Sequence, residues 1–276
     1  MGIGKRYPFD EDRAARRALK EAVARAYFMF SGFKPGEQLS VCRCGQCMEP
    51  EIEPALLTTP LRQIEPSLLS EYNWAADAPG SIPFDHDELR YFLPRFFELI
   101  AEEQYPHFSD PALTLRRLGY ANYRTNWPKE QATAIDRFFN AFLELQLSRP
   151  IGITQTQDGR GFPFTGLHDD ILCLCVHGGA DLTALLARWE TKPNLAANRH
   201  RATMAYALAR SEQLGFSFPG PFWDALPNAA ATLRSWVLMP KTLDCLKQAL
   251  HTESDPDLRE AWQTTHDDIS TRPHRA

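Results

Sequence analysis

The sequence predicts an all-α protein, built as an irregular array of packed helical hairpins in the style of HEAT repeats. Apolar residues recur at the helical period along most of the chain, and capping residues and prolines mark the points where helices begin. Pairs of short helices joined by short turns favour stacked hairpins. Because no repeat of fixed period is present, we expect irregular packing rather than a true solenoid.

The first half of the chain carries clear helix signals. Asp85 and Glu88 have the spacing of a capping box, and Asp110-Pro111 places a capping residue before a proline at the first helical position. Pro94 lies inside an apolar pattern and removes a backbone donor, which predicts a kink or a break into two helices. The helices expected in this half cover residues 11–30, 67–77, 85–104 and 128–148.

The second half continues the pattern after one irregular stretch. Residues 150–166 contain four glycines and two prolines and predict either a small hairpin, turning at Asp158-Gly159, or a long loop. Gly178-Gly179 and Gly215 are the predicted helix stops, and Asp255-Pro256 marks a further start. The helices expected here cover residues 168–178, 181–190, 195–213, 227–238 and 241–252.

The irregular stretch is also the best place to divide the chain. We expect an N-terminal helical half at residues 1–149, which contains a cysteine cluster, and a C-terminal helical half at residues 150–276. A chain of 276 residues is long enough for one large domain or two closely packed ones, and we expect one continuous compact domain.

The composition is that of a folded protein of a reducing compartment. Apolar residues make up 43% and charged residues 24% of the chain. The sequence shows no secretory signal, no myristoylation motif and no apolar run long enough to span a membrane. Six cysteines are too sparse for a disulfide scaffold, so we expect a cytoplasmic protein with reduced thiols.

The most distinctive motif in the chain is a cluster of three cysteines with the spacing Cys42-x-Cys44-x-x-Cys47. Structural zinc sites use four ligands, so this spacing predicts three of the ligands of a zinc ion. The predicted fourth ligand is His86. His107 and a second ligand-rich run at 173–177 are alternatives, although Cys173 and Cys175 fit better as core thiols. The competing interpretation is three reduced thiols without a metal, and a redox role is weaker because no thioredoxin-like context surrounds them.

Charge is strongly segregated along the chain. Residues 1–48 hold nine basic against five acidic residues, whereas residues 49–106 hold three basic against twelve acidic ones. An acidic surface repels nucleic acid and attracts a basic protein, although solvated helix faces explain the same pattern. The predicted partner-binding residues are Glu71, Asp77, Asp87, Glu98, Glu102 and Glu103.

No catalytic residue is predicted, because no recognised enzyme motif is present in the sequence. We therefore expect a non-enzymatic scaffold that binds a protein, most concretely an immunity protein that neutralises a bacterial toxin effector. The alternative is a metal-dependent hydrolase that uses zinc or the His-Asp pairs at 86–87, 168–169 and 266–267. Acidic caps at helix starts explain those pairs without chemistry.

The cysteine cluster and the downstream run from Tyr91 to Arg95, Tyr-Phe-Leu-Pro-Arg, resemble a group of bacterial all-helical proteins without an established activity. The resemblance continues through Leu182 to Trp189, Phe222-Trp223 and Trp236. It implies the helical fold and a bacterial setting, and it carries over no catalytic residues.

Overall fold

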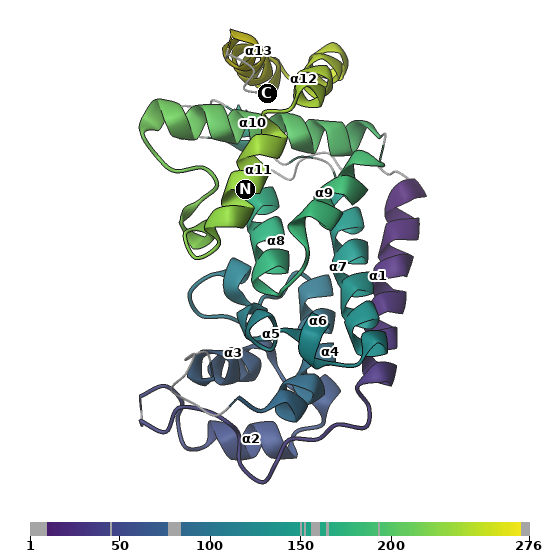
Figure 1. The fold of residues 1–276 in the computed structure, drawn as a ribbon, viewed down its shortest axis with the longest axis vertical. Coiled ribbons are helices and arrows are strands. Elements are labelled where there is room, and N and C mark those ends of the chain that lie inside the picture. The colour runs from purple at the N-terminus through teal and green to yellow at the C-terminus, as the bar shows by residue number, and fades with distance from the viewer. Residues whose placement is uncertain are drawn as a thin grey trace. The chain divides into compact units, whose positions relative to one another are not determined.

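The structure, a computed structural model, describes residues 10–44, 46–76, 84–149, 151, 153–155, 161–163, 166–192 and 194–271 (Figure 1). It is all-α, as predicted. The helices are α1 (Asp10–Met29), α2 (Ile52–Thr58), α3 (Pro66–Ala75), α4 (His86–Ala101), α5 (Arg116–Tyr120), α6 (Tyr123–Asn126), α7 (Lys129–Leu147), α8 (Gly166–His177), α9 (Leu182–Glu190), α10 (Leu195–Leu214), α11 (Pro227–Val237), α12 (Pro240–Thr252) and α13 (Pro256–Thr271), with 3-10 turns at Leu61–Gln63, Pro111–Leu113 and Pro221–Trp223.

The predicted helix caps form as side-chain hydrogen bonds. The Asp85 carboxylate accepts the backbone N–H groups of Asp87 and Glu88 at 2.8 and 3.1 Å, which satisfies two free donors at the start of α4. Asp255 caps α13 in the same way. The reciprocal half of the capping box does not form, because the Glu88 side chain is directed into the core.

Pro94 does not break its helix. The structure shows α4 as one helix that contains Pro94, so the predicted alternative of two helices is wrong. Proline removes one backbone donor, but Pro94 is buried, as are Phe92 and Phe96 on either side of it. Burial of large aromatic side chains stabilises a helix by more than one hydrogen bond contributes.

The predicted glycine stops are confirmed. Gly215 follows α10 with φ of 73°, and Gly179 follows α8 with φ of 86°. Both values lie in the left-handed region, which glycine adopts without steric cost. The predicted hairpin is also present: β1 (Ile153–Gln155) pairs antiparallel with β2 (Gly161–Pro163), and Thr154 lies opposite Phe162. Its expected turn at Asp158-Gly159 lies outside the described residues.

The described chain falls into two compact units. The first unit comprises residues 14–143 and 173–181, and the second comprises 144–172 and 182–276 together with the first residues of α1. The predicted boundary at residue 149 stays a prediction, because compactness does not show which segments fold by themselves. Among the described helices, none has both the length and the apolar character that crossing a bilayer requires.

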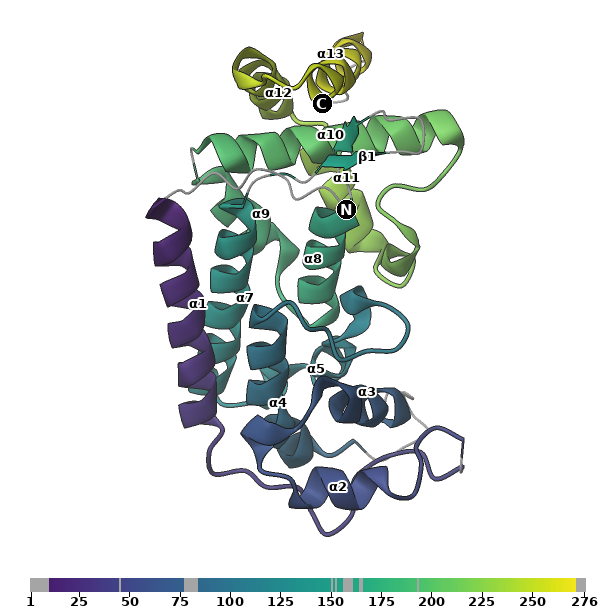
Figure 2. The ribbon, with the colours of Figure 1, turned by 180° about the vertical axis from the view of Figure 1, so that it is seen from behind.

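Aromatic stacking forms the core of the first unit. The Phe97 ring of α4 stacks on the Phe138 ring of α7 with centroids 3.8 Å apart, and Phe138 stacks in turn on Phe142. In both views α1 runs beside α7 (Figures 1 and 2). The Phe30 ring, just after α1, contacts the ring of Trp127, just before α7. These ring contacts join α4 to α7, and the end of α1 to the start of α7.

The second unit is organised around the long helix α10, which α12 and α13 cross on one side (Figures 1 and 2). Arg201 of α10 is buried and donates three hydrogen bonds. Its guanidinium donates to the Thr242 hydroxyl, the Trp236 carbonyl and the Glu190 carboxylate at 2.8, 2.9 and 3.1 Å. One buried arginine thereby links α9, α10, α11 and α12.

Candidate metal centre

The three cysteines of the cluster lie together in the loop between α1 and α2. The sulfur atoms of Cys42, Cys44 and Cys47 are all within 4.8 Å of one another, and those of Cys44 and Cys47 are 3.4 Å apart. Two thiolates on one tetrahedral zinc ion are about 3.8 Å apart, given a Zn–S distance of about 2.3 Å. The three sulfurs are therefore close enough to bind one metal ion.

Hydrogen bonds hold this loop in place. The Cys42 N–H donates to the carbonyl of Ala75, at the end of α3, at 2.8 Å. The Arg43 guanidinium donates two hydrogen bonds of 2.8 Å to the Glu53 carboxylate of α2. The same carboxylate also accepts a hydrogen bond from the Leu39 N–H. Because α2 and α3 both anchor the loop, the cysteines need little further ordering to converge.

The thiols differ in acidity. Hydrogen bonds from the backbone N–H of Gln46, and then from the other two thiols, lower the pKa of Cys44 to about 7. Hydrogen bonds that Cys47 makes with the Cys44 and then the Cys42 side chain raise the pKa of Cys47 to about 11. Thiolates are the form that binds metal, and a bound cation favours the thiolate at all three positions. Cys44 is also exposed, so an ion can reach it from solvent.

The structure does not bring His86 into the three-sulfur group. The Trp127 indole N–H donates to His86 Nδ1 at 2.9 Å, and burial lowers the pKa of the imidazole. His107 accepts two backbone N–H groups of its own turn, from Ser109 and Asp110. Within the described part of the chain, no histidine, carboxylate or further cysteine joins the group. A fourth ligand at His86 stays a prediction without support from this geometry.

The second ligand-rich run belongs to the core. Cys173 and Cys175 are buried in α8, and burial raises the pKa of Cys175. A thiol in apolar surroundings resists ionisation and is a poor ligand for an incoming ion. Their placement agrees with the interpretation of core thiols.

The predicted partner-binding carboxylates are placed very differently from one another. Glu98 accepts hydrogen bonds from Tyr27, Arg62 and Arg95 at 2.6, 2.9 and 2.7 Å, and its side chain is only 19% exposed. Asp87 is exposed and pairs with Arg90 of the next helical turn. Both charges are therefore compensated within the molecule.

The other acidic residues differ in how far they are exposed to solvent. Glu102 and Glu103 are exposed where α4 ends, and Glu71 is half-buried on α3. Partial burial, and then the negative charge of nearby Glu49, raise the pKa of Glu71. Asp77 lies outside the described residues. Sequence reasoning did not separate Glu98 from Glu102. Arg95 lies only three residues before Glu98, but Arg62 and Tyr27 come from distant segments.

Among the described residues, none of the His-Asp pairs belongs to a group of three or more potential metal ligands. His86 bonds to Trp127 in the first unit, whereas His266 pairs with its own neighbour Asp267 on α13 of the second unit. The His168 side chain lies outside the described residues.

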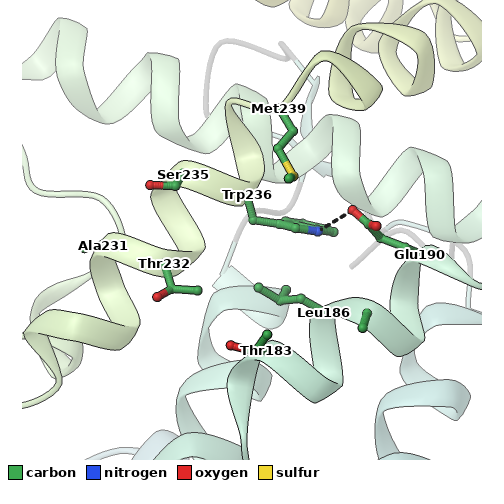
Figure 3. Close-up of a pocket in the computed structure, with 9 residues that line it drawn as sticks. Thr183, Leu186, Glu190, Ala231, Thr232, Ser235, Trp236 and Met239 are labelled. Atoms are coloured by element: carbon green, nitrogen blue, oxygen red, sulfur yellow. Dashed lines mark hydrogen bonds between the residues drawn. The ribbon is translucent and has the colours of Figure 1, made fainter. Parts of the chain in front are cut away.

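A surface pocket of about 510 Å³ lies in the second unit between α9 and α11 (Figure 3). Leu186, Trp236 and Met239 form apolar walls, and Thr183, Thr232 and Ser235 add hydroxyl groups. The Glu190 carboxylate accepts the Trp236 indole N–H at 2.8 Å, as Figure 3 shows. No pattern in the sequence indicates this pocket, because its two helices are far apart in the chain.

Comparison with known proteins identifies no relative: no family model, no curated protein and no solved structure matches the chain. The resemblance to the bacterial helical group therefore stays a prediction. The observed counterpart of that resemblance is an all-helical chain with a close group of three cysteines.

Proposed function

We propose that this chain is a non-enzymatic helical scaffold that binds another protein, most concretely a bacterial immunity protein that neutralises a toxin effector. The observation that carries the proposal is the pair of exposed carboxylates, Glu102 and Glu103, at the end of the well-packed helix α4 within the acidic stretch 49–106. A rigid acidic site speeds association with a basic partner and selects against acidic ones. The resemblance to bacterial helical proteins supports the same setting.

Reversing both exposed charges tests this proposal. We expect Glu102→Lys with Glu103→Lys to slow association with a basic toxin domain, about tenfold at low salt, and we expect the difference to shrink as salt screens it. The first toxin domain to test is the product of the adjacent gene, and association rates measured at two salt concentrations give the readout.

Glu98→Gln is the matched control for the charge reversal. Because Tyr27, Arg62 and Arg95 already compensate Glu98, this change affects stability rather than association. Equal association rates for the wild type and the double reversal, at every salt concentration, would remove this acidic site from the interface.

We also propose that the cysteine group holds a structural zinc ion, with Cys42, Cys44 and Cys47 as thiolate ligands. A thiolate group in an exposed loop anchored to two helices suits a soft divalent ion that fixes the loop. The ion would have a structural role, because a zinc ion bound by several cysteines orders the chain around it.

Zinc analysis of the purified protein tests this second proposal. We expect one equivalent of zinc, and we expect its loss in Cys42→Ser, Cys44→Ser and Cys47→Ser, whereas Cys245→Ser in α12 retains it. Free zinc at a hundred times its dissociation constant stabilises the folded state by about 2.7 kcal/mol, so a chelator should lower the melting temperature. A metal-free protein with the same melting temperature in chelator would exclude the zinc ion and the zinc-dependent hydrolase alternative together.

A further inference from the structure

We propose that Trp74, Phe108 and Glu71 form a docking surface for an arginine- or lysine-bearing segment of a partner protein. This inference rests on the proposed function, because it supplies the chemistry by which a protein partner is recognised. It differs from the acidic site at Glu102 and Glu103 in that it combines two aromatic rings with a carboxylate.

The two rings are exposed and packed against each other. Trp74 is 45% and Phe108 is 55% exposed, and their ring centroids are 6.4 Å apart in an edge-to-face arrangement. Each large apolar ring therefore presents much of its surface to solvent, at a cost in free energy that a partner would relieve. Tryptophan and other aromatic residues are the usual anchors of protein interfaces.

Buried hydrogen bonds fix the two rings relative to each other. Asn73, the residue before Trp74, is buried, and its amide donates to the carbonyls of Pro106 and Thr114 at 3.0 Å each. These bonds tie the segment that carries Phe108 to α3. The surface is thus ordered before any partner arrives, which lowers the entropic cost of binding.

The charge beside the rings points to a cationic partner. Glu71 lies three residues before Trp74 on α3, so their side chains share one face of the helix. The nearby Glu49 adds a second negative charge. Neither carboxylate has an ion pair among the described residues, in contrast to Glu98 with its two arginines. A guanidinium or ammonium group can contact an aromatic face and a carboxylate together at such a surface.

Two peptides of opposite charge test this surface on the full chain. One is an eight-residue peptide of alternating glycine and arginine, and the other alternates glycine and glutamate. The readout is the indole N–H resonance of Trp74 in protein labelled with ¹⁵N-tryptophan, assigned by its loss in Trp74→Phe. We expect the basic peptide to shift this resonance saturably and the acidic peptide to leave it unchanged.

Substitutions identify which side chains hold the peptide. We expect Phe108→Ala and Glu71→Gln each to weaken binding of the basic peptide by about two- to fivefold, the effect of an exposed cation–π or ion-pair contact. Phe216→Ala and Glu260→Gln remove an exposed ring and an exposed carboxylate of the second unit and should leave binding unchanged. The proposal is overturned if the basic peptide does not shift the Trp74 resonance. It is also overturned if the control substitutions weaken binding as much as Phe108→Ala and Glu71→Gln do.

The peptide experiment and the toxin-binding experiment can give opposite results, so failure of this docking surface is distinguishable from failure of the immunity proposal. A shift of Trp74 by the basic peptide, without any affinity for a toxin domain, supports this surface and counts against the immunity role. Toxin binding that leaves the Trp74 resonance unmoved supports the immunity role and removes this surface.

Discussion

Replacing Gly119 by alanine is expected to destabilise the protein by about 3 kcal/mol or more, at or above the upper end of the usual cost of overpacking. A Cβ at this position would lie 2.1 Å from the backbone oxygen of His177 and 3.2 Å from its carbonyl carbon. A carbonyl cannot rotate away as a side chain can, so α5 and the end of α8 would have to separate. The melting temperature should fall by about 6–12 °C, measured by calorimetry or circular dichroism.

Gly32→Ala is the matched control, because a Cβ there meets nothing within 4 Å. It should change the free energy of unfolding by no more than about 0.5 kcal/mol, as ordinary surface substitutions do. If Gly119→Ala has the same melting temperature as Gly32→Ala and the wild type, the close approach of α5 to α8 is not a feature of the folded protein.

The sequence was sufficient to predict the long helices, because their signals are local. The Asp85 and Asp255 caps and the Gly215 stop each depend on residues within a few positions of one another. The short helices α2, α5 and α6 were not predicted, since a helix of four to seven residues does not repeat an apolar pattern. Tertiary packing determines such short elements.

In the candidate metal centre, too, local features could be predicted from the sequence and long-range contacts could not. The spacing of Cys42, Cys44 and Cys47 was enough to predict that their sulfurs converge, since the three lie within one short loop. The choice of His86 as a fourth ligand depended on a long-range contact, and the structure instead pairs His86 with Trp127. Compensation of Glu98 by Arg62 and the pairing of Trp74 with Phe108 were inaccessible for the same reason.

Replacing Glu88 by leucine is expected to destabilise the protein by about 3–5 kcal/mol, because it leaves a buried arginine without its counter-charge. The Glu88 side chain is fully buried, and it accepts the Ser40 N–H at 2.7 Å and the Tyr72 hydroxyl at 2.8 Å. Arg117, 3% exposed, lies 3.8 Å from the same carboxylate. Denaturant unfolding of Glu88→Leu measures the loss.

The structure also specifies what should rescue this variant. Arg117 is held above the Tyr72 ring, and its Nε and Nη1 atoms have no hydrogen-bond partner in the described chain. Its burial therefore depends on the charge of Glu88. Replacing both members of a buried ion pair by apolar side chains of similar size is often neutral, whereas removing one is costly. Glu88→Leu with Arg117→Met should regain most of the lost stability. A double variant no more stable than Glu88→Leu would show that the hydrogen bonds to Ser40 and Tyr72, rather than the charge pair, account for the loss.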